Sequence, residues 1–124
     1  MRWIVDAMNV IGSRPDGWWK DRGAAMVRLT RQLEQWATAE HQRVTVVFEK
    51  PPSPPISSEV VGIAAAPRAG ADSADDEIVR LVRADDCPHD IIVVTSDLGL
   101  AQRVTEAGAA SLPASRFRDL LEET

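Results

Sequence analysis

Two runs of branched apolar residues constrain the fold of this chain most. "RVTVVF", Arg43–Phe48, and "DIIVVTS", residues 90–96, are rich in Val and Ile and bounded by polar residues, a pattern typical of β-strands. The second run holds four consecutive branched apolar residues without polar alternation. Such a strand is buried on both faces, as in a parallel sheet covered by helices. The sequence therefore predicts an α/β protein.

The remaining elements fit the same architecture. Shorter apolar runs predict strands at residues 3–5 and, less strongly, 60–65. Apolar residues spaced three and four apart predict amphipathic helices between and after the strands, over residues 23–39, 73–82, 98–107 and 115–122. Strands that alternate with helices indicate βαβ units, so we expect a single, doubly wound, mainly parallel sheet with helices on both faces. Residues 1–124 are expected to form one domain without internal repeats.

Composition limits the classes of function. The chain has neither a secretory leader pattern nor an apolar run near the roughly 18 residues that span a bilayer, which predicts a cytoplasmic protein without membrane contact. One cysteine, Cys87, and two histidines cannot form a zinc cluster, so any metal would be held by oxygen. The net charge of −5 argues against extensive, sequence-independent binding of nucleic acid, but it allows a local basic patch.

Acidic residues fall where a sheet of this kind binds its ligands. Asp6 follows the first strand directly, and Asp97 follows the strand at residues 90–96. Asp75 and Asp76 lie in the first turn of the helix predicted from residue 73. A right-handed crossover starts that helix at the same edge of the sheet, outside the carboxyl ends of the strands, where ligands bind. We therefore expect these acids to converge.

Crowded carboxylates raise one another's pKa, and a hard divalent cation such as Mg²⁺ or Mn²⁺ relieves the repulsion. Asn9, three residues after Asp6, can orient a carboxylate or a phosphate. Two such ions about 3.5 to 4 Å apart would activate water for phosphodiester cleavage. Glu49 also ends a strand, but Lys50 follows it, so Glu49 stays outside the predicted site.

Structural roles compete with the catalytic one for individual acids. Asp75 and Asp76 can simply complement a helix dipole, and Asp97 can cap a helix that starts at Leu98. Asp6 is harder to explain in this way, because no helix obviously begins after it. The prediction of a site depends on the convergence of the acids.

Four blocks in order resemble the NYN domain, and more narrowly the YacP-like branch of the PIN-like ribonucleases. They are "IVDAMNVIG" (4–12), "VTVVFE" (44–49), "ADSADDEIVRLV" (71–82) and "IIVVTSDLGLAQRV" (91–104). The resemblance covers nearly the whole chain. It implies a PIN-like sheet in strand order 3-2-1-4-5 and a metal-dependent endoribonuclease that hydrolyses RNA.

The resemblance also implies roles for individual residues. Asp6, Asn9, Asp75, Asp76 and Asp97 match family positions that bind Mg²⁺ or Mn²⁺ and position the attacking water. The chain departs from the family after its second strand, where an Asp-Gly pair is often found and "EKPP" (49–52) stands instead.

Residues 13–23 follow the first strand and combine basic side chains with Trp18 and Trp19, which suits phosphate contact and base stacking. The tryptophans can equally pack as a lid on the domain, with the charges merely solvated. The predicted substrate contacts are Arg14, Lys20, Arg22 and, upstream of the acidic helix, Arg68.

Other functions remain open at this point. The chain could be an RNA-binding or interaction module that keeps the fold without turnover. A phosphoacceptor receiver domain also gathers acids at a sheet edge, but its lysine after the fifth strand is not evident. "GxGxxG" and "GxxxxGK[ST]" are absent, which argues against a nucleotide hydrolase. The expected partner is RNA, delivered by a ribosome or another protein if the acidic chain needs help, and an exposed helix face could support a homodimer.

Overall fold

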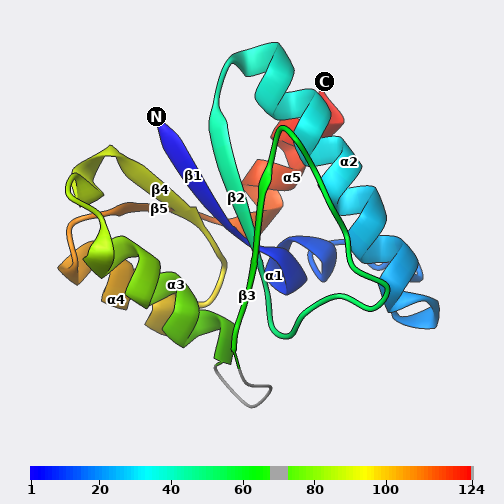
Figure 1. The fold of residues 1–124 in the computed structure, drawn as a ribbon, viewed down its shortest axis with the longest axis horizontal. Coiled ribbons are helices and arrows are strands. Elements are labelled where there is room, and N and C mark those ends of the chain that lie inside the picture. Colours follow the sequence, from blue (N-terminus) through cyan, green and yellow to red (C-terminus); the bar gives the residue numbers. More distant parts are fainter. Residues whose placement is uncertain (68–72, 124) are drawn as a thin grey trace.

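A computed structural model of the chain describes residues 1–67 and 73–123. Its centre is a five-stranded sheet in the order β3-β2-β1-β4-β5, with every neighbouring pair of strands parallel (Figure 1). The predicted fold class and strand order are confirmed. The strands are β1 (Arg2–Asp6), β2 (Arg43–Phe48), β3 (Gly62–Ala65), β4 (Ile91–Val94) and β5 (Ala110–Leu112).

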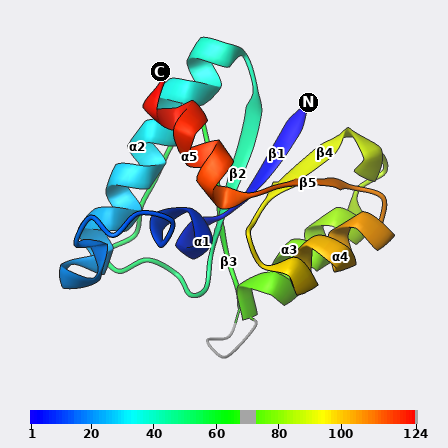
Figure 2. The same cartoon turned by 180° about the vertical axis from the view of Figure 1, so that it is seen from behind.

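Helices cover both faces of the sheet. Figures 1 and 2 show α1, α2 and α5 on one side and α3 and α4 on the other. No helix within the described residues is long and apolar enough to cross a membrane. The helices are α1 (Ala7–Ile11), α2 (Arg22–Glu40), α3 (Ser73–Ala84), α4 (Leu98–Glu106) and α5 (Ala114–Glu122), with short 3-10 helices at Trp18–Lys20 and Pro88–Asp90.

Each face of the sheet has its own apolar cluster. Val5 of β1 and Val46 of β2 pack with α1, α2 and α5, whereas Ile4 and Val47 pack with α3 and α4. Adjacent residues of one strand thus enter opposite clusters, which is why these strands are apolar without alternation. On the first face, Phe117 of α5 lies edge-on to Trp36 of α2, with ring centroids 5.0 Å apart.

The element boundaries differ from the predicted ones at functionally important points. Strand β1 extends through Asp6, and β4 ends at Val94, so Asp97 lies three residues beyond its strand instead of directly after it. The sequence did not predict α1, because five residues are too short to show helical periodicity. It also missed β5, an edge strand whose first two residues, Ala110 and Ser111, are small and exposed.

Candidate active site

Asp6 ends the central strand at the carboxyl edge of the sheet. It pairs in register with Val47 of β2, and the pairing of Val5 with Val94 brings Thr95 alongside it. The residue is only 4% exposed. Contrary to the sequence expectation, a helix does begin directly after it, since α1 starts at Ala7. The Asp6 side chain nevertheless makes no capping hydrogen bond to that helix.

Two neutral side chains hold the Asp6 carboxylate instead. Its Oδ2 accepts hydrogen bonds from Asn9 Nδ2 at 2.9 Å and from Thr95 Oγ1 at 3.0 Å. Asn9 in turn accepts a hydrogen bond at Oδ1 from the backbone N–H of Ser96, at 3.1 Å. The backbone N–H of Asp97 donates to Thr95 Oγ1, also at 3.1 Å. These bonds join β1 and α1 to the segment after β4 and fix the orientation of the carboxylate.

The predicted residues gather around a hollow of about 160 Å³ at this edge. We call it the acidic hollow. It unites residues from the ends of β1 and β2, from α1, from the start of α3 and from the residue before α4. Four of the five residues predicted for catalysis line it, together with Glu49, which the sequence prediction left out. Its lining residues are Asp6, Met8, Asn9, Glu49, Ser73, Ala74, Asp75 and Asp97.

Electrostatics in the acidic hollow disfavour the ionised form of its central acid. Burial, together with the negative charges of Asp75 and Asp97, raises the pKa of Asp6 from 3.8 to about 6. The hydrogen bonds from Thr95 and Asn9 oppose the shift in pKa but do not cancel it. A cation bound nearby would stabilise the ionised form of this carboxylate.

A hydrogen bond between distant segments brings α3 to the hollow. The hydroxyl of Ser73, the first residue of α3, donates to the backbone carbonyl of Glu49 at 3.1 Å. The Ser73 hydroxyl thus joins α3 to the end of β2. This contact places Asp75, two residues later, and Glu49 at the same edge.

Two of the predicted acids have structural partners as well. Asp97 caps α4, because its Oδ1 accepts a hydrogen bond from the N–H of Leu100 at 3.0 Å, while its side chain still lines the acidic hollow. Asp76 does not line the hollow. Its side chain is 70% exposed and lies 3.1 Å from Arg103 of α4 in an ion pair. The structure thus separates Asp76 from Asp75, its neighbour in the sequence.

The donors suit a hard cation, although they do not form a complete cage. Among residues 1–67 and 73–123, no group of three or more Asp, Glu, His or Cys side chains is arranged to hold a metal ion. Mg²⁺ usually takes one or two protein carboxylates and completes its shell with water and substrate phosphates. The carboxylates of the hollow, at a carboxyl edge with repelling charges, fit that mode of binding and not a closed structural site.

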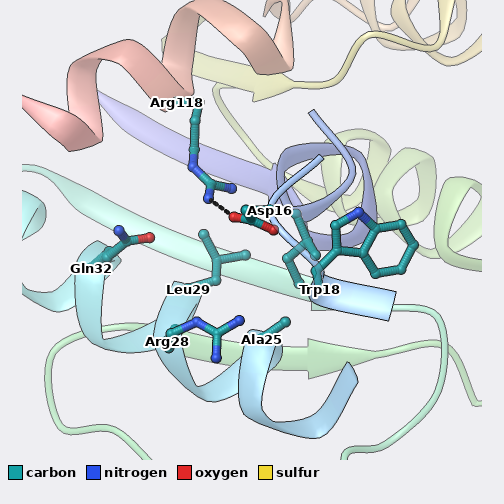
Figure 3. A pocket seen from close by; sticks show the side chains of 8 residues that line it. Asp16, Trp18, Ala25, Arg28, Leu29, Gln32 and Arg118 are labelled. Atoms are coloured by element: carbon teal, nitrogen blue, oxygen red, sulfur yellow. Dashed lines mark hydrogen bonds and ion pairs between the residues drawn. The ribbon is translucent and has the colours of Figure 1, made fainter. Parts of the chain in front are cut away.

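Ion pairs join the basic segment before α2 to α5. Arg14 forms ion pairs with Asp119 at 2.6 Å and Glu122 at 3.2 Å. Arg118 of α5 donates to Asp16 at 3.0 Å (Figure 3). Both residues line a small cavity of about 40 Å³. Arg14 therefore has acidic partners within the fold, which makes it a weaker candidate for RNA contact than the sequence suggested.

The two tryptophans and the remaining basic side chains predicted to contact the substrate differ in their environments. Trp18 is partly buried against the core, as expected of a packed lid, whereas Trp19 is 54% exposed. The guanidinium of Arg22 lies over the Trp18 ring, 5.4 Å from its centroid. Lys20 is exposed in the 3-10 helix next to them. Arg68, the fourth predicted contact, lies outside the described residues.

Sequence reasoning missed Thr95 and Ser96, whose hydroxyl and backbone groups organise the site. A signal for them was available in "TSD" (95–97). Once β1 and β4 are predicted to be neighbours with aligned carboxyl ends, the residue after β4 lies beside Asp6, and a hydroxyl there can bond to its carboxylate.

Comparison with known proteins identifies the family. The sequence pattern of the YacP-like NYN domain matches residues 3–124. The chain belongs to the YacP-like NYN domain family.

Two curated relatives, both called UPF0178 protein, come from Halorhodospira halophila and Maridesulfovibrio salexigens. The first is 48% identical over 62 residues, which is 50% of this chain and 34% of the relative. The second is 34% identical over 98 residues, 76% of this chain and 58% of the relative. The chain thus spans less than two thirds of either relative's length.

Solved structures of the family share the fold of this chain. The crystal structure of Rae1 (YacP) from Bacillus subtilis superposes with a TM-score of 0.80 at 23% identity, covering 99% of this chain and 76% of that one. A mutant of the same protein gives a TM-score of 0.77 at 22% identity, covering 99% and 77%. The chain therefore has the α/β fold of these structures, with a parallel sheet in the order β3-β2-β1-β4-β5 and helices on both faces.

Proposed function

We propose that this YacP-like NYN domain is a metal-dependent endoribonuclease that hydrolyses RNA phosphodiester bonds. The buried carboxylate of Asp6 supports this most directly, since it faces two further acids at the carboxyl end of the central strand. A carboxylate whose pKa is raised to about 6 is costly to keep ionised at neutral pH. A cation bound beside Asp6 would offset that cost. Membership of a family with a nuclease-like fold is consistent with the same chemistry.

Five residues in or beside the hollow have a defined part in the proposal. Asp6 and Asp75 would hold Mg²⁺ or Mn²⁺, and Asp97 would add a further carboxylate while it caps α4. Asn9 and Thr95 orient the Asp6 carboxylate through their hydrogen bonds. The metal, when bound, would lower the pKa of a bound water and stabilise the charge that develops on the phosphate. Asp76 is left out, because it points to Arg103.

The direct test is an RNA cleavage assay with matched variants. The purified protein is incubated with a panel of RNAs, free and bound to ribosomes, in Mg²⁺ or Mn²⁺ and in EDTA. Asp6→Asn should abolish cleavage, whereas Asp86→Asn, an exposed acid outside the hollow, should leave it intact. Cleavage that survives both EDTA and Asp6→Asn would exclude the proposed mechanism.

Metal binding has its own readout. Mg²⁺ or Mn²⁺ at millimolar concentration should raise the melting temperature of the wild type and of Asp86→Asn, but not of Asp6→Asn, because a ligand that binds only the folded state stabilises it. An equal rise in all three proteins would place the cation outside the acidic hollow.

The second candidate is an RNA-binding or interaction module with the same fold and no turnover. The observation in its favour is that the described residues hold no group of three acids, histidines or cysteines arranged for a metal. This alternative predicts that RNA binds with similar affinity in EDTA and in Mg²⁺ and is recovered uncut. Cleavage abolished by Asp6→Asn would rule it out.

A further inference from the structure

A groove leads away from the acidic hollow between α2 and the segment after β2. Met8 and Glu49 line both the hollow and a neighbouring pocket of about 240 Å³. That pocket shares Met26 and Pro52 with a further pocket of about 330 Å³, which reaches Ile56. We call the two pockets together the side groove. It extends the acidic hollow along the first half of α2.

The wall of the side groove next to the hollow is apolar and polarisable. Met8 and Met26 line it from α1 and α2, and Phe48 contributes from the end of β2. Pro51 and Pro52 form part of the same lining. Methionine adapts its shape and makes favourable contacts with flat aromatic rings. A volume of about 240 Å³ is just below the roughly 300 Å³ at the small end of ligand pockets, which suits a fragment such as one nucleoside.

Two cationic side chains line the same pocket, which Glu49 also lines. No ion pair within residues 1–67 and 73–123 involves Arg22 or Lys50. Arg22 begins α2 and rests on Trp18, while Lys50 follows Glu49 at the end of β2. By contrast, Arg14 and Arg118 are paired with acids. The groove therefore combines positive charge for phosphates with an apolar surface for bases, in a protein of net charge −5.

We propose that the side groove binds the single-stranded RNA segment next to the phosphodiester bond in the acidic hollow. One base packs against Met8 and Met26, and the flanking phosphates contact Arg22 and Lys50. The inference rests on the proposed function, because RNA is assigned to the groove through its continuity with the hollow. A base can enter such a pocket only when it is unpaired. The apolar lining contacts base faces, so binding tolerates any base.

The first experiment measures binding without cleavage. The affinity of a short, fluorescently labelled single-stranded RNA is followed by anisotropy in EDTA at several salt concentrations. The variant Arg22→Glu/Lys50→Glu is compared with Arg28→Glu/Arg83→Glu, which changes the net charge equally with exposed arginines outside the groove.

The groove variant should bind at least about tenfold more weakly, and its salt dependence should fall, since each phosphate contact contributes about 0.7 to the slope of log K against log salt. Two lost contacts would lower that slope by about 1.4. Equal weakening by the control variant would overturn the inference, because it would show a general charge effect. Melting temperatures verify folding, and Arg22→Ala and Lys50→Ala replace the double variant if it melts early.

A second experiment locates the strand. RNA that carries 4-thiouridine should crosslink to residues 22–26 and 48–53, and crosslinks found only elsewhere would contradict the inference. The same sequence annealed into a duplex should bind at least about tenfold more weakly, because its bases are stacked and paired. Equal affinity for the duplex would also overturn it.

The outcomes separate the two proposals. RNA binding that depends on Arg22 and Lys50, without cleavage in any metal, would support the groove and contradict the nuclease. Cleavage that depends on Asp6, with RNA binding unaffected by Arg22→Glu/Lys50→Glu, would support the nuclease and contradict the groove.

Discussion

The charge on Asp6 should make the protein less stable at neutral pH, and removing that charge should reverse the effect. The pKa of Asp6 is raised from 3.8 to about 6 in the fold, chiefly by burial. Below the lower value both states are protonated and no penalty arises. As the pH rises from 3.8 to about 6, the unfolded chain releases a proton that the folded chain retains. The free energy of unfolding therefore falls until the pH passes about 6. Two pKa units correspond to about 3 kcal/mol.

Asp6→Asn removes the titrating group and keeps an oxygen that can accept hydrogen bonds from Thr95 and Asn9. Relative to wild type, we expect the variant's free energy of unfolding to be higher by about 3 kcal/mol near pH 7.5, but by only about 0.5 kcal/mol near pH 4. Urea unfolding followed by tryptophan fluorescence at both pH values measures the difference. Added Mg²⁺ should narrow it near pH 7.5 by stabilising the wild type alone.

Asp86→Asn is the matched control, because it removes an exposed carboxyl of the same size outside the hollow. Near pH 7.5 its free energy of unfolding should lie within about 0.5 kcal/mol of wild type, as is usual for exposed positions. If Asp6→Asn gave the same gain at both pH values, or a loss of stability near pH 7.5, burial of a costly carboxylate would be the wrong description of this site.

Three further substitutions test other parts of the fold. Asp97→Ala should lower the free energy of unfolding by about 1 kcal/mol in urea titrations, because α4 loses the cap that Asp97 gives the Leu100 N–H; no change would mean that the cap is dispensable. Phe117→Ala should cost about 3 to 5 kcal/mol, since it empties a fully buried position in the core; a cost near 1 kcal/mol would indicate that the core collapses around the gap. Asp76→Asn should change RNA cleavage less than about twofold, because its ion pair with Arg103 is exposed; loss of cleavage would return Asp76 to the site.

The sheet was predictable because its strands carry a strong local signal. The range of β2 matches the prediction, and the apolar run at residues 90–96 correctly indicated a strand buried on both faces. Elements without a strong signal were missed, since α1 is one short helical segment and β5 has an exposed start. Those short pieces form where neighbouring structure supports them, which local periodicity does not encode.

The part of the site that lies at the ends of the strands was predictable from the sequence. Convergence at the carboxyl edge brought Asp6 and Asp97 into the same hollow. Which of two adjacent acids enters the hollow is set by the rotation of α3 about its axis, and this separates Asp75 from Asp76. The inclusion of Glu49 depends on the contact from Ser73, which joins segments 24 residues apart. Sequence spacing cannot specify such details of orientation.

The bond from the Ser96 amide to Asn9 gives the site a natural spectroscopic reporter. Ser96 is exposed, yet its N–H donates to the same side chain that holds the Asp6 carboxylate. In an amide hydrogen-exchange or NMR experiment, this single amide can be followed without an engineered probe. Its exchange rate reports whether the segments after β1 and β4 stay joined, and its chemical shift senses any ligand that draws the carboxylate away from Asn9.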